Sequence, residues 1–72
     1  MAYEHYYFND NTDDKGRHEV HTGSCSYIPA TQNRTYIGYK SSCSDAIEAA
    51  KSSYPSYKFD GCYWCCRPCH KG

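Results

Sequence analysis

The stretch GCYWCCRPCHKG, residues 61–72, brings four of the six cysteines of this chain close to a histidine. Cys62 and Cys65 form one C-x-x-C pair, and Cys66 and Cys69 form a second pair directly behind it. A C-x-x-C turn lets two thiolates converge on one metal ion. Cysteines at such spacings also form disulfides, redox pairs or haem attachments. The fold of this chain therefore depends on which chemistry its cysteines adopt.

The composition indicates one small domain, residues 1–72, with few aliphatic side chains. The 72 residues include no Leu and only one Val, against nine Tyr. A chain of this length buries only about 60% of the surface that its unfolded form exposes. Domains with so small a core are usually stabilised by disulfides or by a metal. We therefore expect sulfur chemistry to hold the fold together.

The charge balance and the N-terminal sequence restrict partners and compartment. The chain has eight basic and eight acidic residues, so the net charge is zero with His neutral. Domains that bind duplex DNA non-specifically carry a basic excess, so no strong binding of that kind is expected. The sequence predicts neither a signal peptide nor a membrane span. It thus favours the cytoplasm, where cysteines stay reduced and metal binding is preferred over disulfides.

Three segments have the composition of strands. Residues 2–8 are aromatic, RHEVH (17–21) surrounds Val20, and RTYIGYK (34–40) has tyrosines on both sides of Ile37. The stretch NDNTDDKG (9–16) between the first two is a turn signal, with Gly16 able to adopt a positive φ. The predicted fold is therefore α+β, with a small antiparallel sheet of about three strands and one helix, stapled by the C-terminal cysteine cluster.

The helix is predicted over Ser44 to Ser53. Ser42 with Asp45, or Asp45 with Glu48, offers an N-terminal cap, and Pro55 stops the helix. A common apolar face is expected from Cys43, Ile47, Ala50 and Tyr54. On this face Cys43 is expected to pack as a small hydrophobe, unless it pairs with Cys66 or Cys69.

Zinc needs two more ligands besides Cys62 and Cys65, and a second pair is present earlier in the chain. His21 and Cys25 are separated by three residues just after the second predicted strand. Together H-x3-C and C-x2-C give a Cys3His set, which is a common composition of structural zinc sites. The fourth ligand is the open point, since Cys66, Cys69 or His70 could replace His21. The run CRPCH (66–70) also matches the haem-attachment motif, but few aliphatic residues are available to enclose a porphyrin.

The motif order carries a resemblance to a known family. VHTGSC (20–25), a capped helix with SDAIEAAKSSYP and the final C-x-x-C together resemble the zinc-binding N-terminal domain of the Ada DNA-repair protein and its short relatives. The resemblance implies His21, Cys25, Cys62 and Cys65 as the four zinc ligands. In the repair domain the first residue of the C-x3-C pair is the thiolate that accepts a methyl group from DNA. That position is His21 here, and an imidazole commits its ligating lone pair to the metal, so methyl transfer by this route is not expected.

Three classes of function are compatible with these patterns. The favoured class is a non-catalytic, zinc-stabilised binding module whose exposed tyrosines and Trp64 contact an unknown protein or nucleic acid. The first alternative is a secreted, disulfide-rich small protein of the toxin or inhibitor type. The second is a thiol-based methyl acceptor or a redox protein. The sequence names neither the partner nor the oligomeric state.

Overall fold

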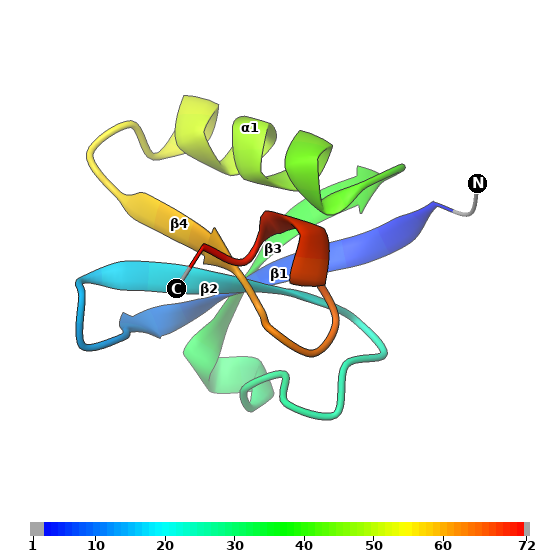
Figure 1. The fold of residues 1–72 in the computed structure, drawn as a ribbon, viewed down its shortest axis with the longest axis horizontal. Coiled ribbons are helices and arrows are strands. Elements are labelled where there is room, and N and C mark those ends of the chain that lie inside the picture. The colour runs from blue at the N-terminus through cyan, green and yellow to red at the C-terminus, as the bar shows by residue number, and fades with distance from the viewer. Residues whose placement is uncertain (1–2, 72) are drawn as a thin grey trace.

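The computed structural model describes residues 3–71, and in this range the chain forms a four-stranded sheet with one α-helix (Figure 1). The elements are β1 (Glu4–Thr12), β2 (Arg17–Thr22), the 3-10 helix η1 (Thr31–Asn33), β3 (Arg34–Lys40), α1 (Cys43–Ser53), β4 (Lys58–Gly61) and the 3-10 helix η2 (Arg67–Cys69). The strand order is β3-β1-β2-β4. The α+β class is confirmed, but the sheet is mixed and has a fourth strand. Ala2 of the first predicted strand lies outside the described residues.

The β1–β2 hairpin confirms the predicted pairing with a shorter turn. Thr12 still pairs with His18, so β1 extends beyond Phe8 and the turn is reduced to residues 13–16. The carboxylate of Asp13 accepts the backbone N–H groups of Lys15 and Arg17, each at 2.9 Å. Gly16 adopts φ 78°, a conformation that other residues disfavour. Asp13 and Gly16 thus close the hairpin together.

The β1–β3 pair contains a bulge that sets which side chains share a face. Tyr6 lies opposite Gly38, whereas Tyr7 lies opposite Tyr36, so Ile37 is the extra residue. A bulge of this kind interrupts the ladder and bends the strand. Because directly paired residues point to the same side of a sheet, Tyr36 shares the face of Tyr7.

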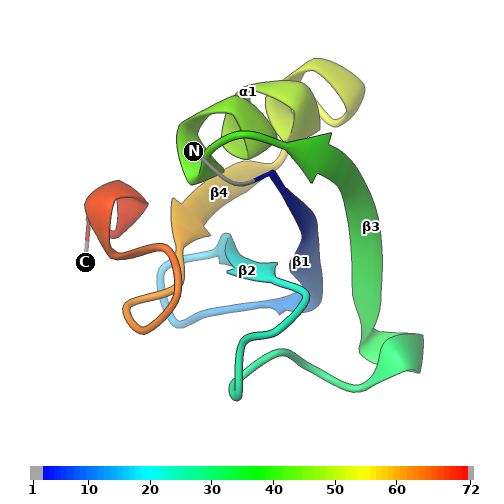
Figure 2. The same cartoon turned by 90° about the vertical axis from the view of Figure 1, so that its right-hand side faces the viewer.

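Helix α1 covers one face of the sheet, and the connection from β2 to β3, which contains η1, lies on the opposite side (Figures 1 and 2). The hydroxyl of Ser42 accepts the N–H of Asp45 at 3.1 Å, which confirms the first of the two predicted caps. The helix buries Ala46 and Ala50, while Cys43 and Ile47 are half-buried. Tyr54 is 37% exposed, so the buried face is rotated from the predicted one and is centred on Ala46.

The core lies between α1 and the sheet. It consists of Tyr6, Phe8, Val20, Ala46 and Cys66, with Ile37, Cys43, Ile47, Phe59 and Cys65 packed around it. Aromatic rings and sulfur thus replace the missing aliphatic side chains. No helix in residues 3–71 is long and apolar enough to cross a membrane.

Strand β4 pairs with β2 in parallel, and it was not predicted from the sequence. It has only four residues, and the single apolar side chain in KFDG is too short a pattern to identify a strand. Its last residue, Gly61, leaves no room for a side chain. A Cβ there would lie 2.5 Å from the carbonyl oxygen of Cys66 and 2.7 Å from the Cβ of Cys69. Glycine therefore allows the C-terminal turn to pack directly on the end of β4.

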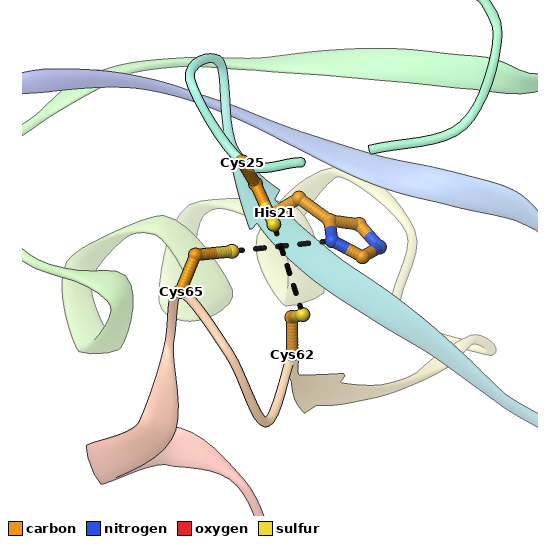
Figure 3. Close-up of side chains that lie close together, drawn as sticks. All are labelled: His21, Cys25, Cys62 and Cys65. Carbon is orange, nitrogen blue, oxygen red and sulfur yellow. Dashed lines mark hydrogen bonds between the residues drawn. The ribbon is translucent and has the colours of Figure 1, made fainter. Parts of the chain in front are cut away.

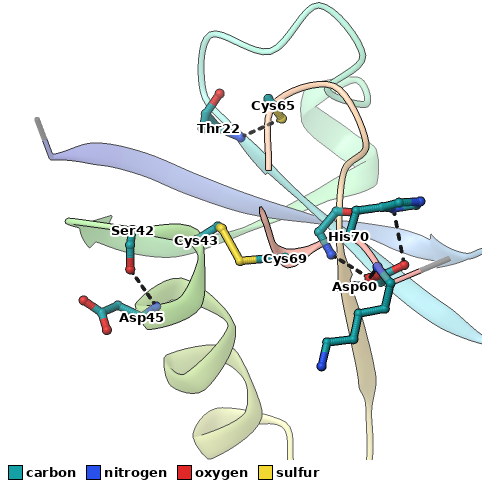
Figure 4. Close-up of a disulfide and its surroundings, with 10 residues drawn as sticks. Thr22, Ser42, Cys43, Asp45, Asp60, Cys65, Cys69 and His70 are labelled. Atoms are coloured by element: carbon teal, nitrogen blue, oxygen red, sulfur yellow. Dashed lines mark hydrogen bonds and ion pairs between the residues drawn. A yellow bond between two sulfur atoms is a disulfide. The ribbon is translucent and has the colours of Figure 1, made fainter. Parts of the chain in front are cut away.

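A disulfide between Cys43 and Cys69 joins the first residue of α1 to the last residue of η2 (Figure 4). The two Cα atoms are 6.4 Å apart, within the range that a disulfide spans. The expectation that Cys43 is a free packing thiol is therefore wrong, and its pairing with Cys69 is the alternative that the structure shows. The bond forms because η2 folds back beside the start of the helix.

Candidate metal centre

The parallel pairing of β2 and β4 brings the two halves of the Cys3His motif together. Val20 and Gly61 are register partners; His21 follows Val20 in β2, and Cys62 follows Gly61 directly after the end of β4. Parallel strands run in the same direction, so the segments that follow them leave the sheet at the same edge. Cys25 lies in the loop after β2, and Cys65 lies in the turn after β4. The topology therefore delivers all four side chains to one place (Figure 3).

The distances between these side chains suit a tetrahedral ion. One ligand atom from each of His21, Cys25, Cys62 and Cys65 can be chosen so that all lie within 4.8 Å of one another. The sulfurs of Cys25 and Cys62 are 3.9 Å apart, and Cys65 Sγ is 3.9 Å from His21 Nδ1. With Zn–S bonds of about 2.3 Å and Zn–N bonds of about 2.05 Å, tetrahedral geometry requires about 3.8 Å between sulfurs and about 3.6 Å between sulfur and nitrogen. The cluster is thus close to metal-binding geometry.

Burial makes this cluster unfavourable for thiolates unless a cation is present. Cys62 is 1% exposed, and burial raises the pKa of its thiol from 9.0 to about 12, although the backbone N–H groups of Cys65 and Trp64 act in the opposite direction. Burial also raises the pKa of Cys25. The pKa of Cys65 is raised by a hydrogen bond with the Cys66 side chain and by burial. A bound cation reverses this preference, because the thiolate is the form that ligates a metal.

Backbone donors around the sulfurs support thiolate ligands. The N–H of Thr22 donates to Cys65 Sγ at 3.4 Å (Figure 4). The turn itself is closed by the N–H of Cys66, which donates to the carbonyl oxygen of Cys62 at 2.9 Å. The Thr22 N–H, which donates to sulfur, stabilises a negative charge on Cys65 and fixes the direction of its lone pairs.

His21 has a suitable partner on the side of the ring that faces away from the cysteines. Its Nδ1 points towards Cys65, while Nε2 is buried and has no hydrogen-bond partner among residues 3–71. A carboxylate oxygen of Glu19 lies 3.7 Å from Nε2. Histidine ligands commonly direct their second nitrogen at a carboxylate, which holds the ring orientation. The residues present therefore fit a metal bound through Nδ1.

The three substitute ligands lie outside this group. Cys66 is 1% exposed and packs in the core. Cys69 is bonded to Cys43, which also leaves CRPCH without the two free thiols that haem attachment needs. The Nδ1–H of His70 donates to the carbonyl oxygen of Gly61 at 2.9 Å, and an Asp60 carboxylate oxygen lies 3.6 Å from the same nitrogen. The structure thus groups His21, and none of these substitutes, with the three cysteines.

Two residues of the site were not identified from the sequence. Thr22 contributes only its backbone N–H, which any residue carries. Glu19 had a readable signal, since it stands two positions before His21 in a strand and therefore points to the same face. Comparison of the chain with protein-family models, curated proteins and solved structures found no match.

Proposed function

We propose that this chain is a non-catalytic binding module whose fold is stabilised by one zinc ion bound to His21, Cys25, Cys62 and Cys65. The observation that carries the proposal is the convergence of four ligand atoms within 4.8 Å, from segments 37 residues apart in the Cys25–Cys62 contact. Borderline-soft thiolate and imidazole donors in a closed tetrahedral set favour zinc among the common metals. Four protein ligands also leave no open position for a substrate, as is usual in structural sites.

The order of the motifs supports a relationship to the Ada-type zinc domain. A strand leads into the H-x3-C pair, a capped helix follows, and C-x-x-C completes the set, as in the resemblance described from the sequence. The histidine at the first ligand position argues against the methyl-accepting reaction, since the Nδ1 lone pair is used for the metal. We therefore propose a shared zinc scaffold with a different role.

Zinc content under native and denaturing conditions tests the proposal. Native mass spectrometry of the protein is expected to show one zinc ion per chain, which acid releases. The variants His21→Ala and Cys25→Ser should lose the ion, whereas His5→Ala, which removes an exposed histidine of β1, should retain it. A folded protein with reduced Cys25, Cys62 and Cys65 that binds no zinc would refute the proposal.

The secreted, disulfide-rich class is the second candidate, and the Cys43–Cys69 disulfide favours it. Structural disulfides are typical of proteins in oxidising compartments. In that case oxidation would also join Cys25 to Cys62, whose sulfurs are 3.9 Å apart. The two candidates differ in mass, because each disulfide formed by oxidation removes two hydrogen atoms, whereas a bound zinc ion adds its own mass.

A further inference from the structure

The sheet carries a continuous row of aromatic rings on the face opposite α1. The row consists of Tyr3, Tyr39, His5, Tyr36 and Tyr7, and we call it the aromatic row. The centroid distances along it are 5.4 Å, 4.7 Å, 5.7 Å and 5.2 Å in that order. His5 and Tyr39 are register partners, as are Tyr7 and Tyr36, so the β1–β3 register determines this face. The rings form one surface that crosses both strands.

The aromatic row is open to solvent rather than part of the core. Tyr3 and Tyr39 are each 56% exposed, and Tyr36 is 52% exposed. Tyr6 and Phe8, at the alternate positions of β1, supply the core on the other face. Cross-strand packing explains why the rings contact one another. It does not explain why three tyrosines stay about half exposed in a chain with few apolar residues, and an exposed apolar surface often marks a binding site.

The charges next to the row suit an anionic partner. The guanidinium of Arg34 lies over the Tyr7 ring, 4.6 Å from its centroid. The two acidic residues of β1 each accept a hydroxyl group, Glu4 from Ser24 and Asp10 from Thr35, and neither is a member of the row. Glu19, on the neighbouring strand β2, is beside His21. The row thus combines three exposed tyrosine rings with a cation at one end, and it has no carboxylate among its members.

We propose that the aromatic row binds single-stranded nucleic acid, with bases stacking on its rings and Arg34 contacting a phosphate. The proposal rests on the proposed function and names the partner of that binding module. The loop that contains the proposed zinc ligand Cys25 connects β2 to β3 on the same side of the sheet as the row (Figure 2). Unpaired bases expose the faces that rings recognise, whereas a duplex hides them. A proline-rich peptide, which docks in aromatic-lined grooves, is the alternative occupant that the test below distinguishes.

The charge balance sets the character of this binding. Stacking supplies most of the affinity, and one arginine accounts for about one phosphate contact. The logarithm of the binding constant should therefore fall with the logarithm of salt concentration with a slope of about −0.7. Binding to duplex DNA should be undetectable near physiological salt, because neither unpaired bases nor a basic stripe is present.

Fluorescence anisotropy of the zinc-loaded protein with labelled oligothymidine and oligouridine tests the proposal. We expect saturable binding, which Tyr36→Ala and Tyr39→Ala each weaken about tenfold or more. Tyr57→Ala is the matched control: Tyr57 is 43% exposed, but its ring stacks on His18 outside the row, so binding should be unchanged. Arg34→Gln should flatten the salt dependence. Circular dichroism and zinc content confirm that each variant is folded.

Several outcomes would overturn the proposal. One is a folded, zinc-loaded protein that binds neither oligonucleotide, and another is Tyr36→Ala and Tyr39→Ala variants that bind as the parent does. A proline-rich peptide that binds through the row in place of the oligonucleotides, or a dimer in sedimentation that buries the row, would also refute it. Zinc content separates the two proposals: binding by a folded, zinc-free protein would refute the zinc site and leave the nucleic-acid surface standing.

Discussion

The Cys3His cluster and the Cys43–Cys69 disulfide both secure the C-terminal segment, but they need opposite oxidation states. The cluster would fix the turn after β4 to the end of β2 by binding a metal, which requires reduced cysteines. The disulfide fixes η2 to the start of α1 and exists only when oxidised. Cys65 and Cys69 belong to different attachments although they are only four positions apart. Position in the fold, rather than the local spacing, thus decides what each cysteine does.

The comparison also concerns strength. A Cys3His site can supply on the order of 10 kcal/mol of apparent binding free energy near neutral pH. A disulfide that closes a loop with a sequence separation of 26 restricts the unfolded chain by about 3.5 kcal/mol in the loop-entropy model. We therefore expect the metal cluster to be the dominant attachment and the disulfide a secondary one.

Removal of the metal should have the largest effect. A strong chelator, added without reductant so that the disulfide remains, is expected to unfold the protein, since the small core leaves little surplus over chain entropy. Reductant alone should lower the melting temperature and leave the protein folded. Far-ultraviolet circular dichroism measures both. If the protein stays folded in chelator but unfolds in reductant, the disulfide is the stronger attachment and the ranking is reversed.

Removal of the disulfide should have an intermediate effect. The double variant Cys43→Ser, Cys69→Ser is expected to lose about 3.5 kcal/mol of unfolding free energy and to keep its zinc. Urea titration with and without reductant measures the loss, and reductant should not destabilise this variant further. If zinc is lost with the disulfide, the two attachments are coupled rather than independent.

A side chain at Gly61 should disturb both attachments at once. Gly61→Ala places a Cβ against the Cys66 carbonyl and the Cys69 side chain, and overpacking of this kind costs about 1–3 kcal/mol. The matched control is Gly23→Ala, where the nearest atom to the new Cβ is a Tyr7 ring carbon at 3.4 Å. Thermal melts of the two zinc-loaded variants provide the measurement. Equal melting temperatures would mean that the C-terminal turn can move away from β4.

The smallest effect is expected at Glu19. Glu19→Gln removes the carboxylate charge beside His21 Nε2, and loss of such a partner typically weakens metal binding about tenfold. Competition with a chromogenic zinc chelator measures the affinity. Glu48→Gln, at an exposed position of α1, is the control and should leave it unchanged. An unaltered affinity in Glu19→Gln would show that the carboxylate does not orient the histidine.

Local signals in the sequence predicted much of this molecule. The Ser42 cap, the stop at Pro55 and the positive φ of Gly16 follow from short-range rules, and each is found in the structure. The grouping of His21 and Cys25 with the C-x-x-C turn was also predicted from spacing and residue type. These features succeed because the residues that determine them are close in the chain or have a chemistry with few alternatives.

Long-range features could not be predicted in the same way. The parallel pairing of β4 depends on the path of the chain through β3 and α1, and the four residues KFDG are too few to indicate it. The partner of Cys43 depends on where η2 comes to lie, and Cys66 and Cys69 were equal candidates by sequence. The alignment of Tyr36 with Tyr7 required the bulge at Ile37.

The different roles of neighbouring cysteines have a consequence for how the chain is assembled. Six free thiols can be joined into three disulfides in 15 ways. A zinc ion bound early would act as a protecting group for Cys25, Cys62 and Cys65, and the core shields Cys66, which is 1% exposed. Oxidation would then find only Cys43 and Cys69. The order of events, metal first and oxidant second, would determine the yield of correctly paired protein.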